Sequence, residues 1–528
     1  MAHVQKTPTS DYERLGARRL GLADVVAQSV GFLGPVFSAA FLVPLVVGII
    51  SATGKGGGGA APLSVIIAAV GVVALGWLVS RYARQVHAAG GLYDYVSRGL
   101  GERAGVAAGI LYYAGILLLS VGLIVLVGGY VHDTVLSEFN KTPLPIWAWS
   151  AILIALVLGV LYTGVRISTR AQLVLALVSL LVVTGFFVMV IVKLGHQNSW
   201  SPFKPSSSAQ GWSGIFFGVL YGVLLFVGFE TAANLGEEAK EPKRMIPIAV
   251  IATALIAAAF YVLATYAQLA GFHFNLTAMG ANAGGPLFAL GGPGPLGYGS
   301  VWIRRLLELV VLFDMVAVAL GTGVASTRGI FALARDRRLP APLASVSRRR
   351  GTPVGAIVVL GVLAAANVVI ASDWTRLFAL PNTPHYFAIF AWDSTFGGFA
   401  LVVVYLLMCV GSIRSFLPAP GRLLAMLAAL VGIAITGGAI YASFYKVAKP
   451  TIYAPYAALG VLVVGIVIAV ATKGRTPAAM HLEDLAVNPE LARLEPLTVA
   501  TPQSPGHLIG STEPAPPGEG LLPGRLPD

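Results

Sequence analysis

The chain has 528 residues, of which 56% are hydrophobic and only 11% are charged, and its formal net charge is +12. Soluble domains carry about a quarter charged residues, so this composition cannot cover a soluble surface of that size. The composition therefore excludes a set of ordinary soluble domains and indicates one large domain in a membrane. The single cysteine, Cys409, excludes a disulfide framework and a cysteine-based metal site.

Long apolar stretches recur along the chain. A spanning helix needs about 20 mostly apolar residues. Twelve stretches meet this requirement: 22–50, 62–81, 103–131, 145–163, 168–193, 211–238, 246–271, 301–327, 354–371, 384–412, 421–443 and 455–472. We therefore predict an all-α membrane protein with twelve transmembrane helices.

The basic residues orient this bundle. With the N-terminus inside, 24 Lys and Arg residues fall on cytoplasmic segments and nine fall on the opposite side. Cytoplasmic loops of membrane proteins carry such an excess. We therefore expect a multi-pass protein of the plasma (inner) membrane with both termini cytoplasmic, and we interpret the positive charge as an orientation signal rather than a nucleic-acid surface.

The polar ends flank one transporter domain. We expect a cytoplasmic N-terminal segment at 1–20, a transmembrane domain at 21–473 and a tail at 474–528. The tail is rich in Pro, Gly and Glu and cannot bury a core, so we predict that it is disordered and cytoplasmic.

Two predicted spans contain interruptions. The span 22–50 carries Gly31-Phe32-Leu33-Gly34-Pro35. Proline removes a backbone donor and pushes the preceding residue out of helical geometry. The alternatives are a proline kink in a continuous span and an unwound stretch in which Gly31 and Gly34 are non-helical.

The second interruption lies in the span 211–238. It contains Phe226-Val227-Gly228-Phe229-Glu230, which places a glycine and a carboxylate near the middle of the span. An ionisable residue at membrane depth is costly and is a functional hypothesis by default.

The two interruptions occupy corresponding positions. The spans within 22–193 and within 211–412 form two sets of five, and each interrupted span is the first of its set. Interruptions in corresponding helices of two halves indicate a transport site near the midplane. Amides at a half-helix N-terminus attract an anion such as a carboxylate, and free carbonyls attract a cation or amine.

At this point the chain resembles the amino acid–polyamine–organocation (APC) superfamily. Four segments carry the resemblance: the glycine-rich break, Ala89-Gly90-Gly91-Leu92-Tyr93 with Gly99, Gly228-Phe229-Glu230 followed by Glu237-Glu238 and Glu241-Pro242, and Ser326-Thr327-Arg328 through Arg335-Asp336 and Gly351-Thr352-Pro353. Their order and spacing fit residues 20 to about 472. The resemblance implies a five-plus-five inverted repeat (about 22–193 and 211–412), two extra helices at about 421–472, and alternating access.

The resemblance also implies roles for single residues. Backbone at Gly31, Phe32, Leu33 and Gly34 would take a substrate carboxylate, and backbone at Phe226, Gly228 and Phe229 would take an amino group. Ser120 and Thr322 fall where relatives line the pocket. Leu224 stands where many relatives place an aromatic gate, for which Tyr221 or Phe226 could substitute, and Ser179 stands where some proton-coupled relatives place a lysine.

Three acidic residues fall at midplane depth: Glu230, Asp314 and Asp393. The alternatives are ion coupling or gating, an acidic lining for a cationic substrate, and structural polar contacts inside the bundle.

The prediction is a secondary active transporter, not an enzyme, for amino acids or related amines, with protons or sodium as candidate coupling ions or with exchange. The alternative within the same fold is a carrier of polyamines or other organocations. A channel would need a repeated filter and a membrane enzyme would need a catalytic cluster, and neither is found in the sequence. No cofactor and no metal site is predicted; the partners are the small-molecule substrate and the lipid bilayer.

Overall fold

The computed structural model describes residues 20–51, 54–86, 90–141, 144–347, 349–373, 378, 384–416, 421–447 and 449–472. All of the described helices belong to one compact unit, Met1–Leu482. The predicted polar segment, apart from residue 20, and the predicted tail at 474–528 lie outside the described residues.

The described chain is helical, as predicted. Its first half contains α1 (Leu22–Leu33), α2 (Pro35–Phe41), α3 (Val43–Val47), α4 (Ala61–Ala83), α5 (Leu92–Leu100), α6 (Glu102–Phe139), α7 (Ile146–Thr163) and α8 (Val165–Leu194). Its second half contains α9 (Gly211–Leu224), α10 (Pro242–Gly271), α11 (Leu276–Ala281), α12 (Pro286–Gly291), α13 (Val301–Arg335), α14 (Val354–Asp373), α15 (His385–Phe416), α16 (Arg422–Phe444) and α17 (Tyr453–Ala471). Short 3₁₀ turns lie between them, among them η5 (Thr231–Leu235). The described residues form two isolated β-bridges and no named strand.

Eleven segments of the described chain are long and apolar enough to cross a membrane. The predicted span 211–238 has no single continuous helix: α9 ends at Leu224, residues 225–230 are irregular, and η5 follows. The all-α membrane fold is therefore confirmed, whereas the count of twelve spanning helices stays a prediction.

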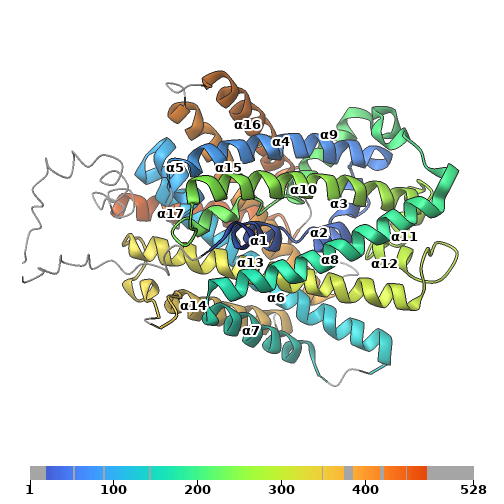
Figure 1. The fold of residues 1–528 in the computed structure, drawn as a ribbon, viewed down its shortest axis with the longest axis horizontal. Coiled ribbons are helices and arrows are strands. Elements are labelled where there is room, and N and C mark those ends of the chain that lie inside the picture. Colours follow the sequence, from blue (N-terminus) through green and yellow to red (C-terminus); the bar gives the residue numbers. More distant parts are fainter. Residues whose placement is uncertain are drawn as a thin grey trace, which may run out of the picture. The chain divides into compact units, whose positions relative to one another are not determined.

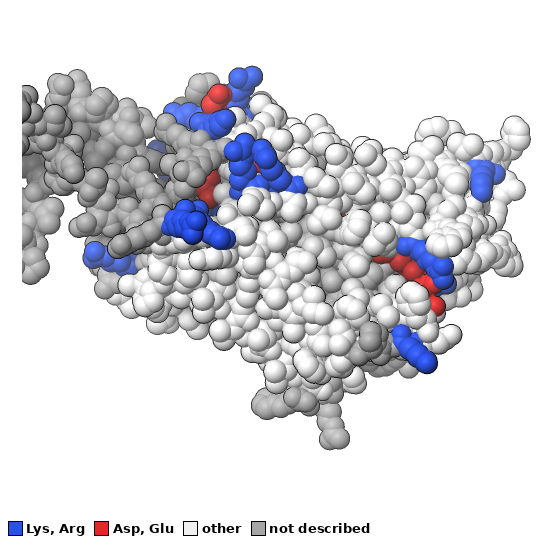
Figure 2. All heavy atoms as spheres, turned by 60° about the horizontal axis from the view of Figure 1, so that its bottom comes forward, with Lys and Arg blue, Asp and Glu red and all other residues white. Residues whose placement is uncertain are grey.

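The surface between the two ends of the bundle is apolar. Figure 2 shows Lys and Arg side chains toward two opposite ends of the visible face, with a wide region between them that carries few charges. Large apolar side chains are exposed on the outer helices, for example Leu181 of α8, Leu424 of α16 and Val467 of α17. Such an extended apolar surface fits a lipid environment.

The first interrupted helix lies inside the bundle (Figure 1). Helix α1 packs against α8, α10 and α13, while α2 continues against the same three helices. The approach of α1 to α13 is close because Gly321 has no side chain: a Cβ there would lie 2.6 Å from the Phe32 amide nitrogen. Small residues allow such backbone contacts between membrane helices.

We predict that the loop containing Ser206 faces outward and that Lys243 faces the cytoplasm. Both side chains are exposed, and the positive-inside bias sets this orientation. In intact cells, a membrane-impermeant maleimide should label Ser206→Cys, whereas Lys243→Cys should react only after permeabilisation.

The unmodified chain is the control for this labelling, because Cys409 is buried. Labelling of Lys243→Cys, and not of Ser206→Cys, in intact cells would reverse the orientation.

Candidate functional site

The break in the first span is confined to one residue. Gly34 adopts a left-handed conformation with φ of 56°, and its amide donates to the Val30 carbonyl, which caps α1. Pro35 then begins α2 without an amide donor. A side chain at Gly34 would be strained, and its Cβ would lie 2.1 Å from Cγ2 of Val318.

The prediction that Gly31 is also non-helical is wrong. Gly31 lies within α1, and a Cβ there would meet the side chain of Gln172 on α8 at 2.5 Å. A left-handed cap at Gly34 ends α1 in a single step, so the residues before it remain helical. Gly31 permits a close helix–helix contact.

The break in the span 211–238 is longer. Six residues, 225–230, are irregular between α9 and η5, and Gly228 has φ of 104°. A Cβ at Gly228 would lie 1.9 Å from Cδ1 of Phe32 on α1. The two interruptions therefore touch each other through Gly228 and the Phe32 ring.

A cavity of about 220 Å³ lies between the two breaks. Phe32 and Leu33 line it from α1, and Leu224 and Val227 line it from the second break. No residue among the described cavity lining is charged. Its polar groups are five hydroxyls, those of Ser38, Thr322, Ser394, Thr395 and Ser443. This volume is below the roughly 300–1,000 Å³ typical of drug-sized ligands, so the cavity suits a small molecule.

Glu230 is fully buried beside the second break and does not line the cavity. The Tyr112 hydroxyl of α6 donates to its Oε1 at 2.9 Å, and Tyr405 of α15 lies next to the same carboxylate. The amides of Gly228 and of Glu230 itself also lie beside this carboxylate. Glu230 therefore lies between the irregular backbone and its two tyrosine neighbours.

Asp314 is fully buried on α13 beside the first break. Its Oδ2 accepts a hydrogen bond of 2.7 Å from the Phe37 amide, and the Val36 amide also lies against its carboxylate. The Asp314 carboxylate therefore lies against the N-terminus of α2.

Asp393 joins three helices. Its Oδ2 accepts a hydrogen bond of 2.8 Å from the Asn367 side chain of α14, and its carboxylate packs against Gly122 of α6. Its neighbours Phe390 and Ser394 line the cavity, whereas Asp393 does not.

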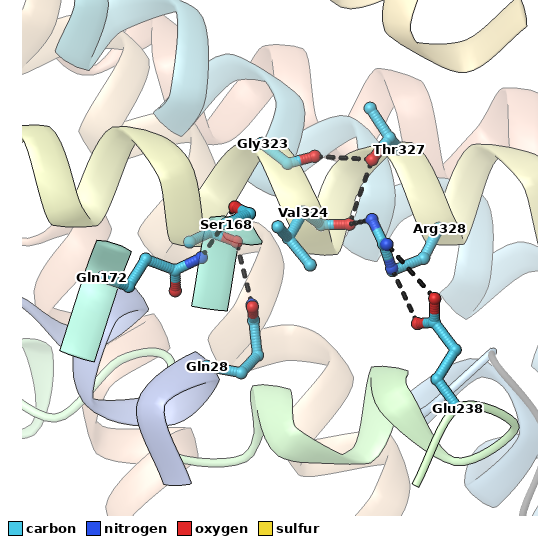
Figure 3. Close-up of polar contacts among 9 residues, drawn as sticks. Gln28, Ser168, Gln172, Glu238, Gly323, Val324, Thr327 and Arg328 are labelled. Carbon is cyan, nitrogen blue, oxygen red and sulfur yellow. Dashed lines mark hydrogen bonds and ion pairs between the residues drawn. The ribbon is translucent and has the colours of Figure 1, made fainter. Parts of the chain in front are cut away.

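A buried ion pair lies toward the end of the bundle that we predict to be cytoplasmic, called the inner end below (Figure 3). Arg328 of α13 donates from Nε to Oε2 of Glu238 at 2.9 Å and from Nη2 to Oε1 at 3.3 Å. Both side chains are only 2% exposed. The Glu238 carbonyl in turn accepts the Leu20 amide, so Leu20, the first described residue, is bonded to the same loop.

A second set of polar contacts lies beside this pair. Arg335 donates to Glu237 at 2.6 Å, and the Tyr93 hydroxyl of α5 donates to Asp336 at 3.0 Å. Burial raises the pKa of Asp336 above its ordinary value, an effect that neighbouring Arg335 opposes. Burial also raises the pKa of Tyr93 well above its ordinary value, which keeps its hydroxyl a donor.

A comparison against known families identifies the chain. The sequence model of the family described as amino acid permease matches residues 32–479. The chain belongs to the amino acid permease family. The family and its relatives are transporters, so this protein is a permease and not an enzyme.

Individual relatives of the permease are distant. A branched-chain amino acid permease of Bacillus subtilis is 23% identical over 66% of this chain and 74% of that protein. A methylthioribose transporter of the same organism is 24% identical over 66% of this chain and 74% of that protein. A vacuolar cationic amino acid transporter of Arabidopsis thaliana is 25% identical over 43% of this chain, and the match covers 35% of the transporter.

A solved structure shares the fold of the permease. The crystal structure of the Eremococcus coleocola manganese transporter with an aromatic bis-isothiourea substituted compound has a TM-score of 0.52 at 12% identity. It covers 88% of this chain and 98% of that chain. At this identity the likeness concerns the fold alone.

Only part of the predicted site meets at the cavity of the permease. Phe32, Leu33 and Thr322 line it, and Gly34 and Gly228 shape the breaks that bound it. The other predicted residues are absent from its described lining: Gly31, Ser120, Tyr221, Phe226, Phe229, Glu230, Asp314 and Asp393.

These residues instead pack between helices. Phe226 lies edge-on against Tyr261 with ring centroids 5.1 Å apart, and Phe229 packs against Tyr405 at 5.9 Å. Ser120 is fully buried, and Tyr221 packs against Phe217 at 6.4 Å. Leu224, at the expected gate position, does line the cavity.

Several residues of the site were not expected from the sequence. The aromatic lining includes Phe37, Phe390 and Phe399, and the sequence assigns no ion-pair partner to Arg328. The sequence strings that carry the family resemblance supplied a signal for the inner end, because Glu238, Arg328 and Asp336 all lie in them.

We predict that Gly228→Ala destabilises the permease and blocks transport. The left-handed backbone costs about 1–3 kcal/mol for a residue with a side chain. The added Cβ would also overlap the Phe32 ring, which lines the cavity. Thermal melting of the purified protein in detergent, followed by tryptophan fluorescence, should show a clearly lower midpoint.

Gly185→Ala is the matched control. Gly185 lies within α8, and a Cβ there would meet nothing within 4 Å. This variant should melt like the unmodified protein, and equal melting of the two variants would contradict the steric argument.

Proposed function

We propose that the permease is a secondary active transporter that moves an amino acid or a related amine by alternating access. The observation that carries the proposal is the cavity bounded by both interrupted spans. Irregular backbone at membrane depth is tolerated where it lines a cavity, and transporters place their substrate sites there. Membership of the amino acid permease family supports the same substrate class.

The two ends of the bundle differ in a way that supports alternating access. At the inner end, the Glu238–Arg328 pair links the loop after η5 to α13. The lining residues Leu42 and Leu45 lie beyond the first break, on the opposite side of it from this pair. A substrate bound at the breaks would therefore need the inner contacts to open before release to the cytoplasm.

Energy coupling would use the buried acids. Within the described residues, no Lys or Arg forms an ion pair with Glu230, Asp314 or Asp393. An unpaired buried carboxylate is costly in the charged form, so Glu230 and Asp393 favour binding of a proton or another cation, whereas the amide donors at Asp314 stabilise its charged form. We propose Glu230 as the coupling residue, because its carboxylate organises the second break. Protons and sodium are the candidate ions.

The proposed setting is the plasma (inner) membrane with both termini cytoplasmic.

The names of the relatives cover amino acids and methylthioribose, so the family does not fix a single substrate. Amino acids and common amines are tested for counterflow with the purified permease in proteoliposomes. We expect saturable counterflow for one of these classes of compound. Absence of counterflow for every compound would refute the proposed function.

We predict that Glu238→Gln opens the inner end. Removing one partner of a buried ion pair leaves an uncompensated charge, at a cost of about 3–5 kcal/mol to the closed arrangement. Ser168 is fully buried near Gln28 and Gln172 on the same side of the bundle (Figure 3). A cysteine at Ser168 should therefore react faster with maleimide in Glu238→Gln than in the parent variant.

Glu241→Gln is the control, because Glu241 is exposed and approaches Arg244 only to 4.0 Å. Arg328→Lys, which keeps the charge and loses the two-point contact, should give an intermediate rate. A rate at Ser168 that is unchanged in Glu238→Gln would remove the gating role.

We predict that Glu230→Gln retains counterflow and loses concentrative uptake. Glutamine keeps the shape of the side chain and its contact with Tyr112 but cannot bind and release a proton. The measurement compares counterflow with uptake driven by an imposed proton or sodium gradient. Glu308→Gln, near the outer end of α13, is the matched control, since Glu308 pairs with Arg304 at 2.9 Å.

If Glu230→Gln accumulated substrate as the unmodified protein does, with the same pH profile, its role would be structural.

A further inference from the structure

The donors of the first break are already occupied. Pro35 has no amide hydrogen, and the Ser38 amide donates to the Gly34 carbonyl at 2.9 Å. The remaining amides at this end of α2, those of Val36 and Phe37, both lie against the Asp314 carboxylate. The position at which an amino-acid carboxylate is expected therefore holds a carboxylate of the protein.

The second break has the same arrangement. The amides of Gly228 and Glu230 lie beside the Glu230 carboxylate, and the Tyr112 hydroxyl donates to it. Each interruption thus has an acidic side chain beside its own released amides.

The acceptors of the two breaks remain available. Within the described residues, no amide or side-chain donor bonds to the carbonyl oxygens of Phe32 and Val227, two residues that line the cavity. For Phe32 the reason is local: the amide four residues ahead, that of Val36, turns toward Asp314. These two carbonyl oxygens and the five hydroxyls of the lining are therefore the acceptors that the cavity residues offer to a substrate.

The ionisable groups around the cavity are all acidic. Glu230, Asp314 and Asp393 lie behind its wall, and each lacks a basic partner in the described chain. Oδ1 of Asp314 is buried with no hydrogen-bond partner among the described residues. The lining also includes the rings of Phe32, Phe37, Phe390 and Phe399, and aromatic faces attract organic cations.

We propose that Asp314 stands in for the carboxylate of the substrate, so that the permease selects organic amines that carry no carboxylate. The inference rests on the proposed transport function and narrows its substrate class. A zwitterionic amino acid would bring a second carboxylate to a site whose donors are taken, and it would be repelled by Asp314. The corresponding amine, which lacks the carboxylate, would keep its ammonium contacts with the carbonyl oxygens.

The test compares amino acids with their decarboxylated amines, which keep the same side chain and lack only the carboxylate. The pairs are alanine with ethylamine, leucine with 3-methylbutylamine, and lysine with cadaverine. Binding to the purified permease is measured by titration calorimetry and by ligand-induced thermal stabilisation, since a ligand specific for the folded state raises the melting temperature. The unmodified protein should bind one of the amines at least tenfold more tightly than its amino acid.

Asp314→Ala frees the Val36 and Phe37 amides and removes the charge. This variant should bind the amino acid more tightly than its amine. Its affinity for the amino acid should be at least tenfold higher than that of the unmodified protein. Asp314→Asn, which keeps an acceptor for these amides, should weaken amine binding without improving amino-acid binding. Glu308→Gln on the same helix controls for the general loss of a buried acid.

Tighter binding of the amino acid than of its amine by the unmodified protein would overturn the inference and leave the proposed transport function intact. An unchanged preference in both Asp314 variants would overturn it as well. Binding of neither member of any pair would refute the proposed substrate class itself, and the inference with it.

Discussion

Backbone polar groups at membrane depth need partners inside the protein, and this requirement governs the centre of the permease. The left-handed residue Gly34 and the irregular segment 225–230 release amides and carbonyls from helical pairing. In hydrocarbon each unsatisfied group costs several kcal/mol. Asp314, from a distant helix, accepts the released Phe37 amide, and Glu230, from within the second break, lies beside the amides of that break.

The same requirement explains why the two breaks touch. Gly228 lies against the Phe32 ring, and Gly321 lies against the Phe32 backbone. Any side chain at either glycine would separate the helices and expose released backbone groups to lipid or to each other. The absence of side chains at these two positions therefore maintains both the helix packing and the cavity beside it.

The sequence allowed the fold to be predicted better than the site. Apolar stretches of sufficient length mark the helices, and Pro35 and Gly228 mark the two breaks, because these signals are local. Gly31 was misassigned because its role depends on Gln172 of another helix. The bond between Asp314 and Phe37 joins residues 277 positions apart, and local patterns carry no information on such a contact. The strings that resemble the superfamily proved to lie largely at the inner end, where Glu238 and Arg328 meet.

The buried pair at the inner end is better suited to switching than to stability. Desolvation of two charges offsets most of their attraction, so a buried ion pair contributes little net stabilisation compared with apolar packing. Its contribution depends strongly on geometry, however. In the proposed alternating-access cycle, water entering the inner end would compensate for separation of Glu238 from Arg328. A transporter needs two arrangements that differ by only a few kcal/mol, so that substrate and ion binding can shift their populations. An ion pair that is costly to bury and readily hydrated provides such a balance, whereas apolar side chains at these two positions would hold the inner end closed in both stages of transport.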